Sequence, residues 1–346
     1  MTNALVIGAA GQLGRPAVAA LAGDGWRVTA ASRSGGRDPS WPEKVRTVRL
    51  DRDEDGPLDE LLSDGFEVVV DLVAFDARHA RQLLRHGDRI GSAVVVSSGA
   101  VYADGEGRSF DTQDEPDGFP AYPVPLPETQ PTVAPGESTY GTRKVALERE
   151  LVAAGRRLPS TLLRAGAVYG PHCRTPRELF FVKRNLDGRR RRVLAYGGES
   201  RFHPVSARNV AELIRLAAAR PGTRILNAAD PQAPTVAEIA AAIDAAMGVT
   251  AETVLVPGEP TAPPVGLTPW STARPVVYDP STAERELGYR PVATYREAVP
   301  ETVAWLSGRL AEVPDWRRAF PTLARNYDTW FDLFDYAAED AWLIDR

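Results

Sequence analysis

The chain has 346 residues, of which 25% are charged and 43% hydrophobic, and its net charge is −5 at pH 7. This balance is that of an ordinary globular protein, and nothing in it indicates nucleic-acid or membrane-surface binding. Cys173 is the single cysteine, which excludes an internal disulfide framework and fits a reducing compartment. No apolar run approaches the ~20 residues of a membrane span, so we expect a cytoplasmic protein without membrane partners.

The first predicted element is a buried strand at residues 4–7, followed at once by a glycine-rich turn and a helical stretch at 16–21. The turn has the spacing G-x-x-G-x-x-G. Glycines between a strand and a helix let backbone N–H groups approach a pyrophosphate at the helix N-terminus. The turn therefore predicts a dinucleotide site. Its expected contacts are Gly8, Gly11, Gln12, Leu13 and Gly14.

The second predicted strand, residues 27–31, ends in Ser32 and Arg33. An NAD enzyme usually carries a carboxylate here, which holds the ribose 2′-hydroxyl. A hydroxyl and a guanidinium suit a 2′-phosphate better. We therefore predict NADP as the cofactor, with NAD as the alternative. Arg33 is otherwise an ordinary solvated turn residue.

Two further strands, at residues 48–50 and 68–70, each end in an aspartate. The carboxyl ends of parallel strands form the ligand-facing edge of such a sheet. We expect cofactor contacts at these two ends. The residues concerned are Asp51, Leu72, Val73 and Ala74.

Tyr140 and Lys144 form the most informative pair in the chain. Residues four apart on a helix lie on one face. Lysine is rare here, because Lys44, Lys144 and Lys183 are the lysines among 41 basic residues. An ammonium near a phenol lowers the phenol pKa from about 10 and makes it a usable general acid or base. The alternative is a solvent-facing pair on an ordinary helix.

The segment 97–102, Ser-Ser-Gly-Ala-Val-Tyr, follows another buried strand. Together with the glycine turn and the Tyr140–Lys144 helix, it resembles the extended short-chain dehydrogenase/reductase family, the NAD(P)-dependent epimerase/dehydratase group. Later segments at 163–171, 203–211 and 278–291 resemble that family too, so the resemblance covers roughly residues 3–306.

The resemblance implies a role for each matching residue. Ser98 matches the catalytic serine that hydrogen-bonds the substrate oxygen, and Tyr140 matches the general acid or base. Lys144 matches the lysine that binds the nicotinamide ribose and lowers the tyrosine pKa. Asp51 matches the adenine contact. Arg201 lies near the place of a substrate-phosphate arginine.

The implied fold is α/β, with a doubly wound parallel (Rossmann) sheet in residues 1–170. A smaller α/β substrate lobe with interleaved segments follows in 171–306, and the crevice between the two is the expected site. Residues 307–346 form an aromatic helical extension that we expect to pack on its own body or to cover the pocket or a dimer mate. A homodimer is expected by analogy with the family.

The departures from the family pattern narrow the chemistry. Gly99 and Ala100 replace the acidic pair of family dehydratases, and neither can transfer a proton. Ala167 replaces an asparagine of many nucleotide-sugar enzymes. Ser98 and Tyr140 are also further apart in sequence than in the family. The surplus lies in residues 103–137, an acidic segment rich in proline and glycine, which is either a lid over the substrate site or a floppy surface loop.

The expected activity is NADP-dependent hydride transfer to or from a carbonyl or alcohol of a small polar, sugar-like or natural-product substrate, with no metal. The first alternative is a sugar epimerase that oxidises and re-reduces one carbon. The second is a family member that binds RNA or nucleotide without turnover, and its only support is the basic run at residues 183–192. We otherwise expect no nucleic-acid partner.

Overall fold

The computed structural model describes residues 2–260, 265–327 and 331–344. The chain forms two compact units, each assembled from three separate stretches. Unit 1 comprises Met1–Gly166, Ala207–Ala229 and Tyr278–Val292. Unit 2 comprises Ala167–Ser206, Asp230–Val277 and Ala293–Arg346. The stretches that return to unit 1 come from the part of the sequence expected to form the smaller lobe.

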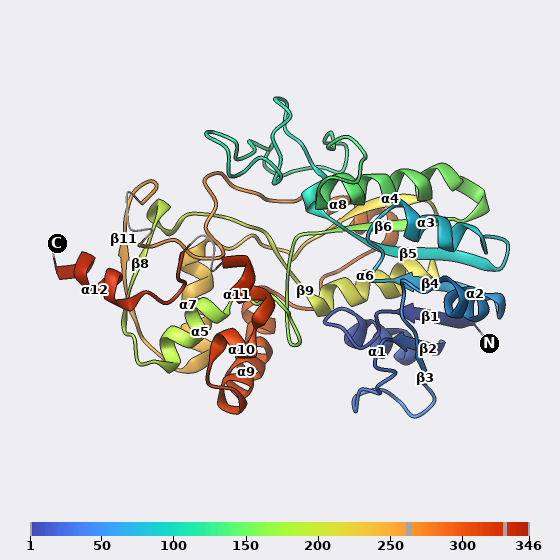
Figure 1. Ribbon diagram of the computed structural model, residues 1–346, viewed down its shortest axis with the longest axis horizontal. Coiled ribbons are helices and arrows are strands. Elements are labelled where there is room, and N and C mark those ends of the chain that lie inside the picture. Colours follow the sequence, from blue (N-terminus) through green and yellow to red (C-terminus); the bar gives the residue numbers. More distant parts are fainter. Residues whose placement is uncertain (1, 261–264, 328–330, 345–346) are drawn as a thin grey trace. The chain divides into compact units, whose positions relative to one another are not determined.

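Unit 1 is built on a parallel sheet of seven strands in the order β10-β6-β5-β4-β1-β2-β3 (Figure 1). The strand order reverses beside β1, which is the signature of a doubly wound sheet, so the predicted fold class is confirmed. The strands are β1 (Asn3–Ile7), β2 (Arg27–Ser32), β3 (Arg46–Arg49), β4 (Phe66–Asp71), β5 (Ile90–Ser98), β6 (Ser160–Ala165) and β10 (Arg224–Ala228).

The helices of unit 1 cover both faces of this sheet. They are α1 (Gly14–Gly23), α2 (Asp55–Ser63), α3 (Ala77–Leu84), α4 (Tyr140–Ala154), α6 (Ala207–Ala219) and α8 (Ser281–Leu287). α1 packs beside α6, and α3 packs beside α4. Leucines of α2, α3 and α4 share one core with the apolar side chains of the central strands. The central strands are buried on both faces, as expected for a parallel sheet.

Unit 2 contains two short parallel strand pairs and a set of helices. β7 (Ala167–Tyr169) pairs with β9 (Pro204–Ser206), and β8 (Arg191–Leu194) pairs with β11 (Glu252–Leu255). The helices are α5 (Leu179–Leu186), α7 (Val236–Met247), α9 (Tyr295–Glu312), α10 (Trp316–Ala319), α11 (Pro321–Tyr327) and α12 (Tyr336–Ile344). α7 begins with a capping box, in which Thr235 and Glu238 each bond the other's backbone.

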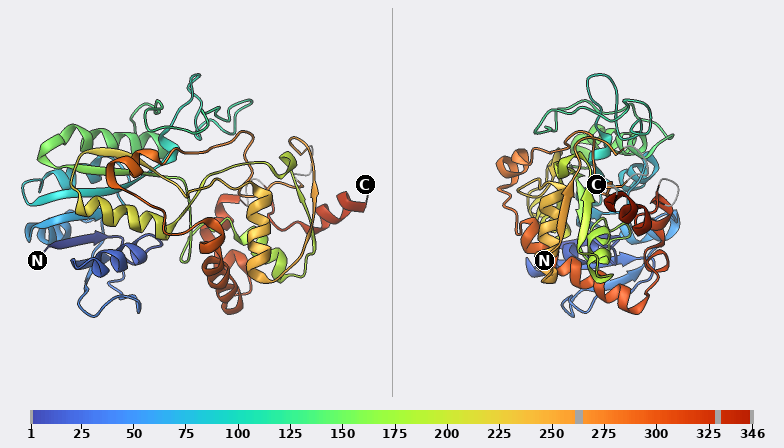
Figure 2. Two further views of the ribbon diagram at one scale, coloured as in Figure 1. Left: turned by 180° about the vertical axis from the view of Figure 1, so that it is seen from behind. Right: turned by 90° about the vertical axis from the view of Figure 1, so that its left-hand side faces the viewer.

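The aromatic C-terminal residues pack on the body of unit 2. Trp316, Phe320 and Leu333 are buried in its core, and Phe331 and Phe334 lie against it. The two views in Figure 2 show α9, α10 and α11 following one another at the side of α7. Trp330, another aromatic of this segment, lies outside the described residues. The described tail thus packs on its own body, the first of the expected arrangements.

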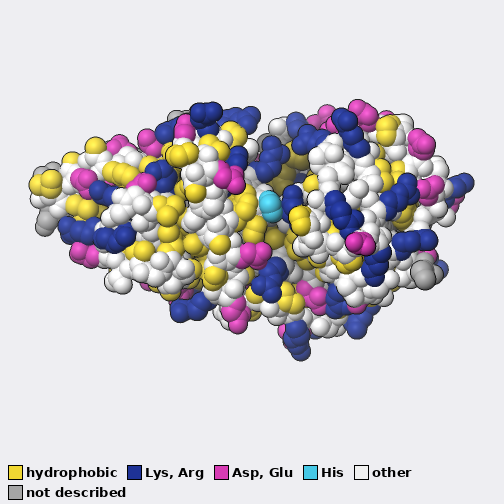
Figure 3. All heavy atoms as spheres, turned by 90° about the horizontal axis from the view of Figure 1, so that it is seen from below, with side chains coloured by type: hydrophobic (Ala, Val, Ile, Leu, Met, Phe, Trp, Pro, Cys, Tyr) yellow, Lys and Arg dark blue, Asp and Glu magenta, His cyan; other side chains and the backbone are white. Residues whose placement is uncertain are grey.

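Among the described residues, no helix is both long enough and apolar enough to cross a membrane. On the face shown in Figure 3, the Lys and Arg side chains are interspersed with Asp and Glu and do not gather in one patch.

Candidate cofactor and catalytic site

The glycine turn has the geometry that a pyrophosphate site needs. Gly8 has a backbone φ of +87°, which residues with a side chain rarely adopt. Its N–H group donates to the Ala31 carbonyl of β2. A Cβ atom at Gly14 would lie 2.3 Å from the Gly8 carbonyl oxygen, so only glycine lets α1 begin this close to the turn. Leu13 caps α1 without a side-chain hydrogen bond; the Arg15 N–H donates to the Gly11 carbonyl at 3.1 Å, and Pro16 has no N–H.

The side chain of Gln12 adds a polar group to this turn. Its Nε2 atom is buried and has no hydrogen-bond partner among the described residues. A buried amide donor without a partner is costly in a protein that has no use for it. Together with the helix N-terminus, it fits an anionic dinucleotide phosphate. The residues of the turn therefore suit the cofactor that the family uses.

At the end of β2, Ser32 is buried and Arg33 is exposed. The Ser32 hydroxyl accepts a hydrogen bond from the Gly35 N–H at 3.2 Å. The neighbouring guanidinium groups are engaged, because Arg15 pairs with Asp38 and Arg37 donates to the Val45 carbonyl at 2.8 Å. For Arg33, no partner is found among the described residues. The same holds for Arg49, which lies opposite Ser32 in the pairing of β2 with β3, so at least two guanidinium groups at this strand end lack a partner in the described part of the chain.

A buried ion pair that the sequence argument missed joins the ends of β3 and β4. Arg52 Nε lies 2.7 Å from Asp71 Oδ2, and both side chains are buried. The other Asp71 oxygen accepts from the Val73 N–H at 3.1 Å. The pair thus fixes the backbone of residues 72–74, the predicted cofactor contacts. Asp51, half-buried, accepts from the Asp53 N–H at 3.1 Å.

Ser98 and Tyr140 come together although 41 residues separate them in the sequence. Ser98 is the last residue of β5 and Tyr140 the first of α4, and the Ser98 side chain lies close enough to the phenol to act on the pKa of Tyr140. Tyr140 is 43% exposed as a residue, although its phenol oxygen is largely shielded from water. The Phe75 ring, 5.4 Å from the Tyr140 ring, was not predicted. Phe75 could have been predicted from its position four residues after β4, near the carboxyl edge of the sheet.

Lys144 lies one helical turn further along α4, and its side chain is buried. Its Nζ donates to the Ala74 carbonyl at 2.6 Å and to the Val96 carbonyl at 2.9 Å. It lies 5.7 Å from the centre of the Tyr140 ring. Burial lowers the pKa of Lys144 to about 8, and the nearby carboxylates of Asp71 and Glu148 act in the opposite direction.

The predicted effect of Lys144 on Tyr140 is not found. In the structure the pKa of Tyr140 is raised, because burial disfavours the phenolate, and the nearby Ser98 side chain only opposes this rise. The Lys144 ammonium is directed at two carbonyl oxygens and is itself easier to deprotonate than a solvated lysine. The prediction assumed an ammonium turned toward the phenol oxygen, and the sequence spacing does not fix that direction.

One turn beyond Lys144, α4 carries a buried acidic side chain, Glu148, that was not predicted. Glu148 accepts from Arg164 Nη2 of β6 at 2.6 Å and from the Ser97 hydroxyl at 2.5 Å. All three residues are buried, and the Arg164 guanidinium also lies 4.7 Å from the Tyr102 ring centre. The network ties α4 to the ends of β5 and β6. Its signal was the i+4 spacing of Glu148 from Lys144.

The segment 103–137 contains no helix or extended strand, as its prolines predicted, but it is firmly attached to unit 1. Leu126 is fully buried, and Tyr122 donates its hydroxyl to the Tyr102 carbonyl at 2.8 Å. Four donors from nearby loop residues converge on Asp104, which lowers the pKa of that carboxyl to about 2. The interpretation as a floppy loop does not fit these contacts, and the role of a lid stays a prediction.

This segment also reaches the N-terminus of the catalytic helix. Thr139 caps α4 and donates its hydroxyl to Asp111 at 2.6 Å. A Cβ atom at Gly141 would lie 2.7 Å from the Ala100 carbonyl oxygen and 3.0 Å from Asp111 Oδ2. The segment and the turn after β5 thus meet beside Tyr140.

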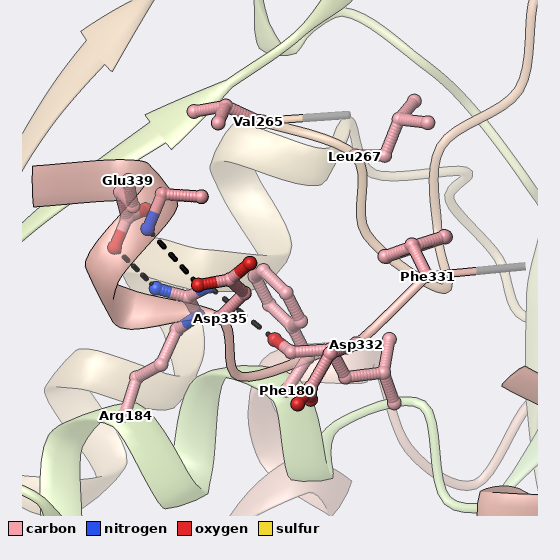
Figure 4. Close-up of a pocket in the computed structure, with 11 residues that line it drawn as sticks. Phe180, Arg184, Val265, Leu267, Phe331, Asp332, Asp335 and Glu339 are labelled. Carbon is pink, nitrogen blue, oxygen red and sulfur yellow. Dashed lines mark hydrogen bonds and ion pairs between the residues drawn. The ribbon is translucent and has the colours of Figure 1, made fainter. Parts of the chain in front are cut away.

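In unit 2, the basic run at residues 183–192 is paired with acidic side chains. Arg184 and Arg189 both contact Glu339 of α12, at 2.6 and 3.2 Å, and Arg192 pairs with Asp244. Figure 4 shows the Arg184–Glu339 pair in the wall of a hollow that Phe180, Val265 and Phe331 also line. The run is therefore a docking surface for the tail, which removes the observation that supported RNA binding.

Arg201, the predicted phosphate contact, lies before β9 and is partly exposed. Its guanidinium donates to the Ala233 carbonyl and lies 3.9 Å from the Glu238 carboxylate. Cys173 is buried. Among the described residues, no group of acidic, His or Cys side chains could hold a metal ion.

The doubly wound sheet with a glycine turn at the start of α1 places the chain in the class of dinucleotide-binding α/β proteins. Its sequence matches the model of the NAD dependent epimerase/dehydratase family over residues 4–229. The chain therefore belongs to this family of NAD(P)-dependent enzymes, which confirms the resemblance seen in its motifs.

Among characterised relatives, the chain is 37% identical over 169 residues to 2'-dehydrokanamycin reductase of Streptomyces kanamyceticus. The match covers 48% of this chain and 42% of that protein, so it spans less than half of either. Solved structures share the fold. The UDP-glucose 4-epimerase of Thermotoga maritima has a TM-score of 0.67 and 21% identity, covering 89% of this chain and 100% of that one. That of Stenotrophomonas maltophila, solved with bound NAD, has a TM-score of 0.69 and 19% identity, covering 90% and 100%.

Proposed function

We propose that the protein is an NADPH-dependent carbonyl reductase that acts on a keto group of a small polyhydroxylated substrate, such as a keto-sugar within an aminoglycoside. The observation that carries the proposal is that the end of β5 and the start of α4 bring the side chains of Ser98 and Tyr140 together at the carboxyl edge of the sheet. The match to a reductase of a sugar-containing antibiotic supports the substrate class. Gly99 and Ala100 supply no acid for a dehydration.

The chain's own groups have distinct tasks in this reaction. Ser98 and Tyr140 hydrogen-bond the carbonyl oxygen of the substrate, which polarises it. Tyr140 then donates its proton to the developing alkoxide. The raised pKa of Tyr140 keeps the phenol protonated at neutral pH, which is the form that reduction needs. Bound NADPH supplies the hydride.

The cofactor would be held by unit 1 residues alone. The amide of Gln12 and those N–H groups of the glycine turn that are not bonded to a carbonyl would face the pyrophosphate, and Arg33 would face the 2′-phosphate. Lys144, fixed by the carbonyls of residues 74 and 96, presents its remaining N–H to the nicotinamide ribose. Because two carbonyl groups hold its ammonium, Lys144 would position the nicotinamide ribose. This role replaces the predicted lowering of the phenol pKa.

The test of the reaction is a panel of ketones, 2′-oxo aminoglycosides included, with NADPH consumption and alcohol formation measured together. A reductase consumes one NADPH for each alcohol formed. Tyr140→Phe should lower kcat by on the order of 10²–10⁴-fold, because it removes the proton donor. Tyr336→Phe is the matched control, since its hydroxyl donates to Asp187 of unit 2. Full activity of Tyr140→Phe would refute the mechanism.

The test of the cofactor uses Arg33→Ala. Loss of a charge-assisted hydrogen bond to the 2′-phosphate should raise the Kd for NADPH about tenfold and leave the Kd for NADH unchanged. Arg27→Ala, at the exposed start of the same strand, is the control. Equal effects of Arg33→Ala on both cofactors would reject the NADP assignment.

A sugar epimerase is the second candidate, favoured by the fact that the same Ser98, Tyr140 and Lys144 set serves transient oxidation and re-reduction. The two solved structures named above are epimerases, although at their low identity they indicate the fold alone. The two candidates differ in stoichiometry. An epimerase turns over many substrates with catalytic cofactor, and a reductase stops when NADPH is used up.

A further inference from the structure

Tyr278 fills the space that a side chain at position 99 would occupy. A Cβ atom at Gly99 would lie 2.0 Å from Tyr278 Oη, 2.4 Å from Cζ and 2.7 Å from Cε1. Tyr278 is 2% exposed, and its ring centre lies 6.2 Å from that of Tyr102. Position 99 therefore requires glycine because a ring from a distant part of the chain packs against its backbone.

Gly99 directly follows Ser98 and begins a short 3-10 turn, Gly99–Val101. The Ser98 hydroxyl accepts a hydrogen bond from the Ala100 N–H at 3.1 Å. The orientation of the Ser98 side chain is thus tied to the position of this turn. Any displacement of Gly99 moves the hydroxyl that faces Tyr140.

The place of Tyr278 is itself determined by buried backbone contacts. Tyr278 forms a parallel bridge with Leu126, and the Asp279 N–H donates to the Leu126 carbonyl at 2.9 Å. Asn227 donates to the carbonyls of Leu126 and Asp279 at 2.9 and 3.2 Å, and accepts from the Tyr102 hydroxyl at 2.6 Å. Asn227 and Leu126 are fully buried. These contacts join the 103–137 segment to the end of β5.

We propose that Tyr278 is a positioning residue for Ser98: its ring braces the Gly99–Val101 turn so that the serine hydroxyl faces Tyr140. The inference rests on the proposed function for its rate measurement. Because the Cβ of a residue at position 99 would clash with ring atoms of Tyr278, the brace depends on the ring and not on the hydroxyl alone. Phenylalanine at 278 keeps the ring and hence the brace, and leucine removes it.

The experiment is a double-mutant cycle with Gly99→Ala, Tyr278→Leu and Tyr278→Phe, measured on the ketone that the wild type reduces fastest. Gly99→Ala should lower kcat at least about tenfold, because small misplacements of reacting groups are costly, with KM and the Kd for NADPH little changed. Tyr278→Phe alone should stay near wild type. Gly99→Ala should remain impaired with Tyr278→Phe, whose Cζ still clashes. Tyr278→Leu alone should also lower kcat, because the brace is lost, and adding Gly99→Ala to it should cost no more, because the clash is gone. Strictly additive effects of Gly99→Ala and Tyr278→Leu would overturn the proposal.

A second measurement needs no substrate. Crystal structures of the wild type and of the Gly99→Ala variant should differ in the distance between Ser98 Oγ and Tyr140 Oη. An unchanged distance in Gly99→Ala would overturn the brace even if every variant folds poorly. If no ketone is reduced by the wild type but the distance changes as expected, the proposed function fails and the positioning role stands. Tyr336→Phe again controls for loss of a phenol hydroxyl elsewhere.

Discussion

Two deeply buried glutamates, one in each unit, differ in their partners. In unit 1, Glu148 is enclosed by the Arg164 guanidinium and the Ser97 hydroxyl. In unit 2, Glu178 is as deeply buried, yet its Oε1 atom has no hydrogen-bond partner among the described residues. Burial raises the pKa of Glu178 to about 7, against weaker opposing effects that include Arg177 and Tyr295.

The difference extends to neighbouring groups. Trp270 Nε1 and Thr302 Oγ1 of unit 2 are likewise buried without partners in the described part of the chain. Satisfied buried networks make side-chain positions rigid, and unsatisfied ones cost stability. The network of Glu148, Arg164 and Ser97 therefore keeps α4 in one position against the ends of β5 and β6. Unit 2 carries polar groups whose burial works against folding.

The largest expected effect comes from breaking the pair in unit 1. Arg164→Met leaves the Glu148 carboxylate buried without its cation, which should cost about 3–5 kcal/mol in the free energy of unfolding. Denaturant titration measures this. The double variant Arg164→Met/Glu148→Leu should recover most of the loss, since an apolar pair needs no partner. Arg81→Ala, which breaks an exposed pair with Glu150, is the control and should cost under about 1 kcal/mol. If Arg164→Met and Arg81→Ala lower the free energy of unfolding equally, the buried pair is no more important for stability than the exposed one.

The matching change in unit 2 should stabilise. The pKa of Glu178 is raised from 4.5 to about 7, so the folded state binds the proton more tightly and the wild type loses stability as pH rises through that window. Glu178→Gln removes the charge and should gain about 1–3 kcal/mol above pH 7, with no gain below pH 4.5. Unfolding curves at several pH values test this. A gain that is independent of pH would contradict the assignment.

In unit 1, the buried Lys144 differs from the buried Glu148, because its hydrogen-bond partners are neutral carbonyl groups and not a group of opposite charge. Its pKa is lowered from 10.5 to about 8, so the unfolded chain binds the proton more tightly and stability rises with pH between these values. Relative to the wild type, Lys144→Met should therefore lose about 1–3 kcal/mol of stability as pH rises from 8 to 10.5. Lys183→Met, whose ammonium pairs with Asp187, is the control. A flat difference between Lys144→Met and wild type would show that the lysine is not desolvated.

The smallest expected effect concerns the cap of the catalytic helix. Thr139→Ala removes the N-cap of α4 and the bond to Asp111, and should cost about 1 kcal/mol. Thr139→Ser keeps both interactions and should be close to wild type. Thermal unfolding distinguishes the two variants. If Thr139→Ala has no effect, the attachment of the 103–137 segment to α4 contributes nothing to stability.

The sequence by itself determined the fold class and the family, and it predicted the candidate site residues. These features are local, because a strand followed by G-x-x-G-x-x-G or a Tyr four residues before a Lys is written in a few adjacent positions. Such patterns carry the periodicity and backbone requirements that a dinucleotide fold imposes. The capping box of α7 was predictable for the same reason.

Only the tertiary structure decided the electrostatics and the long-range contacts. The direction of the Tyr140 pKa depends on where the Lys144 ammonium points, and two carbonyls from β4 and β5 segments settle that. The Arg52–Asp71 pair, the Tyr278 ring against Gly99 and the pairing of the basic run with α12 join residues far apart in the chain. Their energies come from burial and close packing, which no local stretch of sequence specifies.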